Sequence, residues 1–201
     1  MKLIIVRHGQ TPENLVDITQ GQLDTHLSQV GIIQAQKLAK RLKNEQLDFI
    51  YCSDLARTKE TLLEIIKFHP DTPVIYDERL REWSKGEAYQ GKPRSLYFEA
   101  QRSSGLNEYD FKPVGAESRN EQLARAQEFL SYIQSHHEQN ETILAVTHAG
   151  WKQVFFHAFF DLPLAPETMD KLAFDNTAVS VFEFNENGRW IRLLNCSRHL
   201  G

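Results

Sequence analysis

The chain has 201 residues, of which 41% are hydrophobic and 25% charged, the proportions of one sizeable globular domain. Its net charge of −4 gives no basic footprint, so we expect no nucleic-acid partner. No apolar stretch approaches the roughly 20 residues that span a bilayer, and no signal-peptide pattern precedes the first strand. Its two cysteines suggest no disulfide framework, and together these features favour a cytoplasmic protein without a membrane partner.

The chain opens with a short apolar run that ends in a cation and an imidazole. Residues 3–6 have the pattern of a strand buried on both faces, and Arg7-His8-Gly9 follows at its carboxyl end. In an open α/β sheet, ligands bind just beyond such ends. An arginine fork matches phosphate geometry, and a neutral imidazole can act as a nucleophile. A strand that ends in Arg-His by chance and meets water is the alternative at this stage.

Two further segments repeat this arrangement. Residues 49–52 form a second predicted strand, and Arg57 lies just past it, near the start of a predicted helix where an anion is favoured. A buried strand is also predicted over residues 142–146, and His148 follows it closely. Taken alone, each segment has an alternative: a surface arginine paired with a nearby acidic residue, or a structural histidine.

Helices and a final hairpin complete the pattern. Ser28 is a predicted N-cap before an apolar stripe, and residues 118–121 form a capping box that begins a long helix. Residues 151–158 carry a third apolar stripe. Residues 178–184 and 190–194 are predicted as two last strands, joined by an Asn-Glu-Asn-Gly turn signal.

The middle of the chain is the least regular part. Residues 73–76 are predicted as a short strand, and residues 77–86 hold several acidic residues among which spacing alone cannot choose. Residues 87–115 are polar and aromatic, and we expect them to be irregular. A connection this long is usually a lid or a binding loop. The alternative is that its aromatic residues pack into a small satellite core, and both can hold.

Alternating strands and helices predict an α/β fold with one domain over residues 1–201. We expect a three-layer αβα sandwich with a mostly parallel central sheet. The carboxyl ends of parallel strands lie on one side of such a sheet. The four residues expected to meet on that rim are Arg7, His8, Arg57 and His148.

Five segments, in order along nearly the whole chain, resemble motifs of the histidine phosphatases, the phosphoglycerate mutase-like superfamily. They are residues 7–14 (similar to Arg-His-Gly-x-Thr-x-x-Asn), residues 53–58 (Ser-x-Leu-x-Arg-Ala/Thr), residues 80–82 followed by Gly86 and Gly91 (the general-acid segment), residues 115–118 (the Gly-Glu-Ser turn) and residues 146–150 (the second catalytic histidine). The resemblance implies a phosphoglycerate mutase-like fold and phosphoryl chemistry.

The resemblance also implies residue roles. His8 would be the nucleophile and become a phosphohistidine, and Glu82 would be the general acid and base. Arg7, Arg57 and His148 would surround the phosphoryl oxygens. Substrate contacts are implied for Thr11, Asn14, Gln20, Gly21 and Ala149. Fixed arginines can neutralise phosphoryl charge and no metal-binding spacing competes, so we expect a small phosphate ester as partner and neither metal nor cofactor.

The chain departs from the family pattern mainly at substrate contacts. Residues 89–91 read Tyr-Gln-Gly where Trp-Glu-Gly is common, and Ala116 and Ala149 replace common glycines. Residues 82–86 lack the mutases' Glu-Arg-His-Tyr-Gly, and the mutases' longer insertion is missing, which favours a metal-independent phosphomonoesterase. The alternatives are a phosphoglycerate mutase-type transfer and a catalytically silent protein that binds phosphorylated ligands. Residues 87–115 are predicted to set the substrate, which stays open together with the oligomeric state, a homodimer included.

Overall fold

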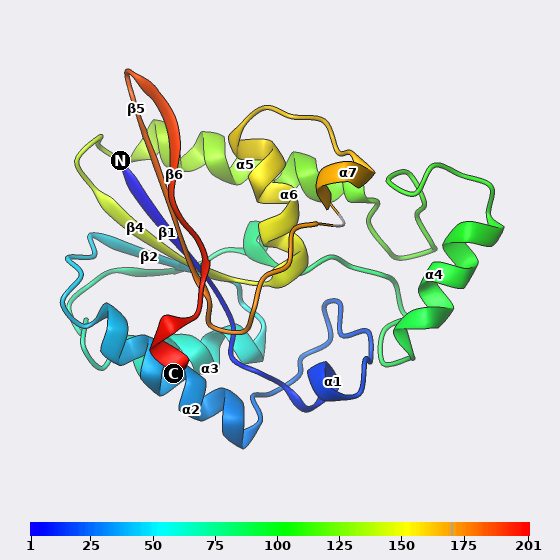
Figure 1. Cartoon of the computed structure of the whole chain (residues 1–201), viewed down its shortest axis with the longest axis horizontal. Coiled ribbons are helices and arrows are strands. Elements are labelled where there is room, and N and C mark those ends of the chain that lie inside the picture. The colour runs from blue at the N-terminus through cyan, green and yellow to red at the C-terminus, as the bar shows by residue number, and fades with distance from the viewer. Residues whose placement is uncertain (170) are drawn as a thin grey trace.

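A six-stranded sheet forms the centre of the computed structural model, which describes residues 1–169 and 171–201 (Figure 1). The strand order is β3-β2-β4-β1-β5-β6. The strands are β1 (Lys2–Arg7), β2 (Phe49–Cys52), β3 (Val74–Tyr76), β4 (Thr142–Thr147), β5 (Val179–Asn185) and β6 (Gly188–Cys196). The first four pair in parallel, while β5 and β6 form an antiparallel hairpin at the β1 edge. The predicted mostly parallel sheet and its hairpin are confirmed.

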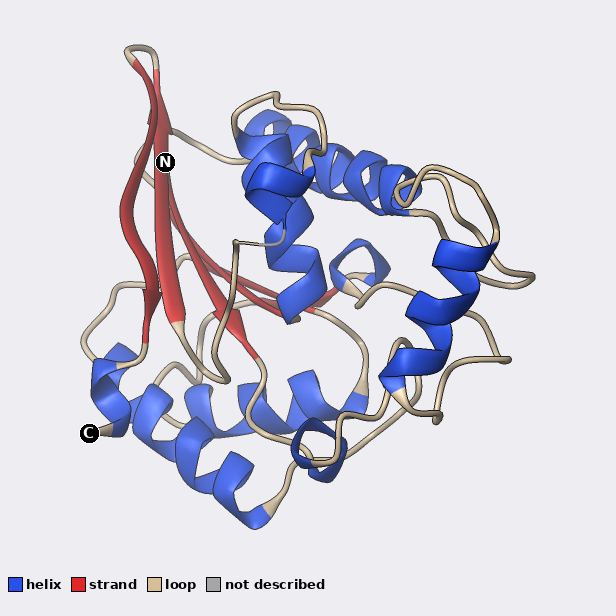
Figure 2. Cartoon of the chain, turned by 45° about the vertical axis from the view of Figure 1, so that its right-hand side comes forward, coloured by secondary structure: helices blue, strands red, loops and turns tan. Residues whose placement is uncertain are grey.

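Helices cover both faces of this sheet (Figure 2). The helical elements are α1 (Pro12–Leu15), α2 (Gln29–Leu42), α3 (Ala56–Ile65), η1 (Glu78–Leu80), α4 (Arg94–Ser103), α5 (Arg119–His136), α6 (Ala149–Phe159), α7 (Pro166–Met169) and η2 (Arg198–Leu200). Side chains of β1 alternate between the two layers. Leu3 and Ile5 pack with residues of α5 and α6, whereas Ile4 and Val6 pack with residues of α2 and α3. The α/β fold with three layers therefore follows from strands that are apolar on both faces.

Local sequence signals fix where two of the long helices begin. The Ser28 hydroxyl accepts a hydrogen bond from the Gly31 N–H at the start of α2. At the start of α5, the Ser118 hydroxyl accepts from the Glu121 N–H, and the Glu121 carboxylate accepts from the Ser118 N–H. The predicted N-cap and capping box are both confirmed, and each satisfies amide groups that the helix itself leaves unpaired.

The prediction that residues 87–115 are irregular is wrong in part, because they contain the helix α4. Its buried face consists of Tyr97 and Gln101, and Leu96 is exposed. This gives no apolar stripe of the usual spacing, which is why the helix has a weak sequence signal. Tyr97 packs edge-on against the rings of Trp83 and Phe111. The aromatic residues of this segment thus form the satellite core that was one of the two expectations.

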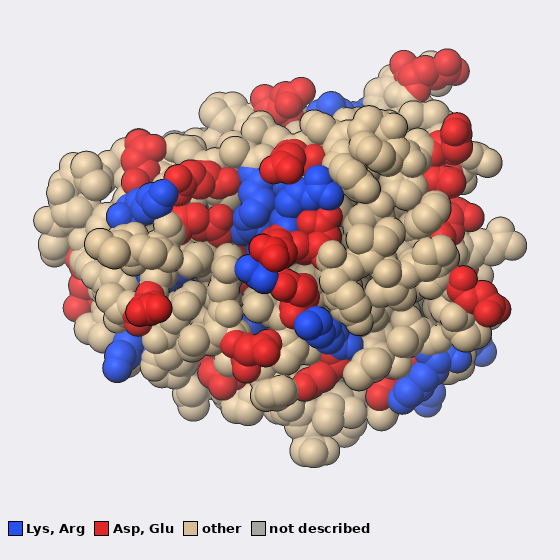
Figure 3. Space-filling view, turned by 180° about the vertical axis from the view of Figure 1, so that it is seen from behind, with Lys and Arg blue, Asp and Glu red and all other residues tan. Residues whose placement is uncertain are grey.

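The surface of the molecule carries both signs of charge. Seen from behind, basic side chains lie next to acidic ones (Figure 3). Ion pairs of this kind join Arg125 to Glu117 at 2.6 Å and Arg79 to Asp77 at 2.7 Å. Across the described part of the chain, no helix is both long and apolar enough to cross a membrane.

Candidate active site

The ends of three neighbouring strands bring two histidines and two arginines together. Arg7 and His8 end β1, Arg57 lies in the first turn of α3 after β2, and His148 is the N-cap of α6 after β4. The His8 and His148 rings lie 5.2 Å apart between centroids, and the Arg57 Nε donates to the His148 Nδ1 at 3.3 Å. The expected convergence on one rim is present.

Arg57 is not a surface arginine paired with a nearby acidic residue, which was the alternative for its segment. Its side chain is buried, with 1% exposure. The nearby acid Asp54 pairs instead with Arg81, whose Nε lies 2.7 Å from the carboxylate. Burial of an arginine without a carboxylate partner costs free energy unless its N–H groups have other acceptors. Backbone carbonyl oxygens are the acceptors for Arg57. Arg57 donates to Gly21 O and Leu23 O, both at 2.8 Å.

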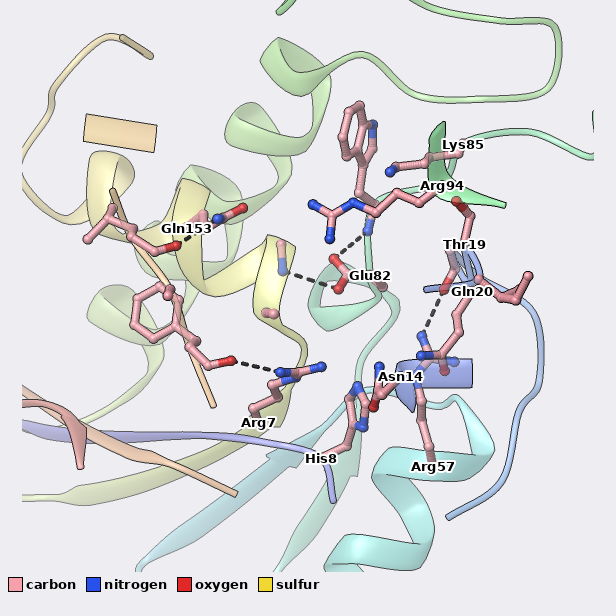
Figure 4. Close-up of a pocket in the computed structure, with 18 of the residues that line it drawn as sticks. Arg7, His8, Asn14, Thr19, Gln20, Arg57, Glu82, Lys85, Arg94 and Gln153 are labelled. Atoms are coloured by element: carbon pink, nitrogen blue, oxygen red, sulfur yellow. Dashed lines mark hydrogen bonds between the residues drawn. The ribbon is translucent and has the colours of Figure 1, made fainter. Parts of the chain in front are cut away.

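A cavity of about 390 Å³ opens above these residues (Figure 4). This volume suits a small molecule rather than a polymer. The residues of its floor are Arg7, His8, Asn14, Gln20, Gly21 and Arg57. The far side is lined by residues that follow η1 or belong to α4, α5 and α6, among them Glu82, Trp83, Lys85, Arg94, Arg119, Ala149, Gly150 and Gln153.

The hydrogen bonds of His8 define its protonation. Its Nδ1 lies 2.7 Å from the Gly9 carbonyl oxygen, which can only accept, so Nδ1 carries the proton and Nε2 keeps its lone pair. Burial, together with the charges of Arg57 and Arg7, holds the pKa of His8 well below its usual value. The imidazole is therefore neutral near pH 7, as a nucleophile requires.

The two floor arginines are fixed before any ligand arrives. Arg7 donates through Nη1 to the Phe174 carbonyl at 2.8 Å, and Arg57 makes the carbonyl contacts given above. Burial lowers the pKa of Arg7, and it lowers that of Arg57 to about 10. Both stay charged at neutral pH. One carbonyl partner belongs to Gly21, whose φ of +52° is a conformation that favours glycine.

His148 lies fully buried behind the cavity wall. It accepts from Arg57 through Nδ1, so its Nε2 carries the proton and donates to the Ser53 hydroxyl at 2.9 Å. Burial and the neighbouring Arg57 charge hold the pKa of His148 well below its usual value. An anion placed between these groups would reverse that trend and favour the protonated ring.

The Glu82 carboxylate faces the floor from the opposite wall. One oxygen accepts from the Trp83 N–H at 2.8 Å, and the other accepts from the Gly150 N–H at 3.1 Å, at the start of α6. A Cβ at position 150 would collide with this carboxylate, so a larger residue there would displace the Glu82 side chain. Both oxygens are held in one orientation.

This geometry agrees with a comparison to known families. The model of the histidine phosphatase superfamily (branch 1) matches residues 3–197. The chain belongs to this superfamily. The family expected from the five motifs is confirmed.

Two relatives of this chain carry phosphatase names, and the solved structure of another protein shares its fold. Phosphoserine phosphatase 1 of Hydrogenobacter thermophilus is 32% identical over 205 residues, covering 100% of this chain and 95% of that protein. The fructose-2,6-bisphosphatase TIGAR of Xenopus tropicalis is 36% identical over 65% of this chain. That match covers 49% of TIGAR, so the chain spans about half the length of this curated relative. The YhfR structure of Bacillus stearothermophilus superposes with a TM-score of 0.86 at 28% identity, covering 100% of this chain and 99% of that one.

Most of the residues expected to contact substrate line the cavity of the histidine phosphatase. They are Asn14, Gln20, Gly21 and Ala149. Thr11 is fully buried at the N-cap of α1 and does not line the cavity, while its N–H donates to the Asn14 side-chain oxygen at 3.1 Å. Thr11 thus lies one contact behind Asn14.

Three cationic side chains of the cavity were not anticipated as site residues. Lys85 follows η1, Arg94 opens α4, and Arg119 opens α5 behind its capping box. None of them directly follows a strand. The expectation that ligand-binding residues lie at the carboxyl ends of the strands therefore did not indicate them. The capping box indicated where α5 begins but not that its first side chain turns into a cavity.

The described residues include no cluster of three or more His, Cys, Asp or Glu that could hold a metal ion. Cys52 and Cys196 are both free thiols.

Proposed function

We propose that this histidine phosphatase hydrolyses a small phosphate monoester through a phosphohistidine on His8. The supporting observation is the neutral, fixed imidazole of His8, which lines the cavity floor together with the charged side chains of Arg7 and Arg57. Phosphoryl transfer depends mainly on positioning and on neutralising the charge of the phosphoryl oxygens. Arg7 and Arg57 would do this directly, and His148 would contribute through Arg57, whose Nε donates to its Nδ1. We call these three residues together with His8 the phosphoryl end of the cavity.

In the first step, the His8 Nε2 lone pair forms a bond to phosphorus while the bond from phosphorus to the ester oxygen breaks. The leaving oxygen takes a proton from the Glu82 carboxyl group, so the alcohol departs neutral. His8 then carries the phosphoryl group on Nε2, and its Nδ1 keeps its proton, which it donates to the Gly9 carbonyl oxygen. The Gly9 contact is well suited to this step because it stabilises the positive charge that develops on the ring.

In the second step, a water molecule attacks the phosphorus of the phosphohistidine. Glu82, now a carboxylate, takes a proton from that water, and the bond between phosphorus and Nε2 breaks. Phosphate leaves, and both residues return to their starting forms. The Trp83 and Gly150 amides keep the Glu82 carboxylate on the leaving-group side throughout.

Phosphate release from a panel of monoesters in the presence of EDTA tests this proposal. We expect the wild type to turn over in the chelator and His8→Ala to lose essentially all activity. His136→Ala is the matched control, because His136 is an exposed histidine at the end of α5. Turnover that survives in His8→Ala, or no release from any ester, would contradict the proposal.

A further inference from the structure

The far side of the cavity holds a second group of cations, which we call the outer cationic end: Lys85, Arg94 and Arg119. Shared aromatic rings hold the three side chains together (Figure 4 labels Lys85 and Arg94). The Lys85 Nζ and the Arg119 Cζ lie 4.8 Å and 3.9 Å from the Trp83 ring centroid. The Lys85 Nζ and the Arg94 Cζ lie 4.8 Å and 5.3 Å from that of Phe98. Three positive groups thus line one side of the cavity.

Lys85 is buried, with 8% exposure, and its Nζ also lies 4.6 Å from the Tyr97 ring. Within the described residues, neither Lys85 nor Arg94 has a side-chain hydrogen bond or a carboxylate partner, and the faces of aromatic rings are their contacts. Lys85 lines the cavity, so its ammonium group is available to an acceptor that a ligand brings.

Several partly buried arginines outside the cavity have carboxylate partners. Arg79, Arg81 and Arg125 each form an ion pair with an aspartate or a glutamate. In the cavity, Glu82 is the one carboxylate among the described lining residues, and two backbone amides already hold it. The cavity therefore offers donors to a ligand anion and offers little to a ligand cation.

We infer that the substrate carries a second anionic group, a carboxylate or another phosphate, which binds Lys85 and Arg94 while the scissile phosphate lies at the phosphoryl end. This inference rests on the proposed function. Arg119 supports the same anion less directly, since its guanidinium donates to the side chains of Gln122 and Gln153 and stacks on Trp83. A substrate with an ammonium group beside the anion would be a poorer ligand, because no free carboxylate among the described lining residues faces it.

The electrostatics of Lys85 agree with this geometry. Burial, together with the charges of Arg94 and Arg119, lowers its pKa to about 7, while Glu82 and Asp17 act in the opposite direction. A second anion bound here would relieve the repulsion among the cations and raise the pKa of Lys85 again. Binding and protonation of this lysine would be coupled.

Three matched esters test the inference on the wild-type protein. Glycerol 3-phosphate and 3-phosphoglycerate differ by one carboxylate, and phosphoserine replaces a hydroxyl of 3-phosphoglycerate by an ammonium group. We expect kcat/KM for 3-phosphoglycerate to exceed that for glycerol 3-phosphate by about 10-fold or more, the worth of a charge-assisted hydrogen bond, and to exceed that for phosphoserine. The pair of fructose 1,6-bisphosphate and fructose 6-phosphate gives the same comparison with phosphate as the second anion. The pair with the larger ratio of kcat/KM shows whether the second anion is a carboxylate or a phosphate.

Variants then assign the preference to named residues. Lys85→Met and Arg94→Gln should each reduce the preferred pair's ratio by about 10-fold, chiefly through a higher KM for the ester with the second anion. Arg102→Gln is the matched control, because Arg102 is an exposed arginine of α4 outside the cavity.

The outcomes separate the two proposals. If the wild type releases phosphate but has no preference within either pair, or if the variants keep the preference, the second-anion inference fails and the proposed function stands. A preference for phosphoserine over 3-phosphoglycerate also contradicts the inference. If no ester is hydrolysed at all, the proposed function itself fails.

Discussion

The two ends of the cavity are built in opposite ways. At the phosphoryl end, His8, Arg57 and His148 are almost completely buried, and each is held by hydrogen bonds to the protein, with the His8 Nε2 left for the substrate. At the outer cationic end, Lys85 and Arg94 rest on aromatic rings and lack such partners in the described structure. The side chains of the phosphoryl end are held by the protein before a ligand binds, whereas those of the outer cationic end have no acceptor until a ligand supplies one.

The difference follows from the elements that carry each end. Strand ends and the first turns of helices packed on the sheet hold side chains rigidly, as a reacting centre requires. The segment from Lys85 to Arg119 passes through irregular chain and α4, anchored by the small aromatic cluster around Tyr97. Such connections can vary without disturbing a scaffold. We therefore place the chemistry at one end and the choice of substrate at the other.

The largest expected effect concerns the group that serves the leaving oxygen. Glu82→Gln should slow hydrolysis of alkyl phosphates by roughly 10² to 10⁴-fold, because the leaving alkoxide then lacks a proton donor. The same variant should lose far less kcat/KM on p-nitrophenyl phosphate, because kcat/KM reports formation of the phosphohistidine and this leaving group departs without a proton. The kcat/KM values on both esters measure the contrast, and an equal loss on both would argue against Glu82 as general acid.

A change confined to the phosphoryl end should leave substrate preference intact. Arg57→Gln removes one fixed guanidinium from the transferred group, so we expect a loss of about 10² to 10³-fold. The loss should be the same for 3-phosphoglycerate and glycerol 3-phosphate. Circular dichroism would check folding, since Arg57 also holds the carbonyls of Gly21 and Leu23. A changed ratio of kcat/KM between the two esters would contradict the separate roles of the two ends of the cavity.

A buried lysine beneath the phosphoryl end offers a test on stability. The Lys152 Nζ donates to the Ala178 carbonyl at 3.1 Å and lies 4.6 Å from the Phe174 ring, and burial lowers its pKa to about 7. From there up to the ordinary value of 10.5, the unfolded chain holds a proton that the folded chain lacks. The wild-type free energy of unfolding therefore rises with pH in this window.

Lys152→Met should consequently be more stable than the wild type at pH 7. Its advantage should shrink by up to about 1.4 kcal/mol per pH unit toward pH 9. Urea unfolding at three pH values measures this. A gain that stays constant, or grows with pH, would show that Lys152 is not held with a lowered pKa.

The smallest expected effect is a pH dependence of substrate preference. The ratio of kcat/KM for 3-phosphoglycerate over glycerol 3-phosphate should fall as pH rises through about 7, where Lys85 loses its charge. The titration of His8 acts on both esters alike and cancels in the ratio. In Lys85→Met the ratio should be lower and independent of pH. A sloping ratio in that variant would assign the effect to another group.

Sequence patterns predicted the scaffold and the phosphoryl end because both depend on local signals. The apolar runs of β1, β2 and β4 are continuous, and each functional side chain comes within a few residues of a strand end. The outer cationic end has no such signal. Lys85, Arg94 and Arg119 meet through the packing of aromatic rings from residues far apart in the chain, and the sequence of α4 does not reveal which of its faces is buried. The position of Thr11 also follows from the fold rather than from its motif, since Thr11 lies behind Asn14, whose side-chain oxygen accepts from its N–H.

The most direct measurement is the identification of the phosphorylated residue during turnover. A rapid acid-free quench with radiolabelled substrate, followed by peptide mapping, should place an acid-labile phosphoryl group on His8. It should accumulate further in Glu82→Gln on p-nitrophenyl phosphate, where formation is spared and hydrolysis by activated water is slowed. Label on another residue would contradict the account. So would full turnover with no labelled protein in either the wild type or Glu82→Gln.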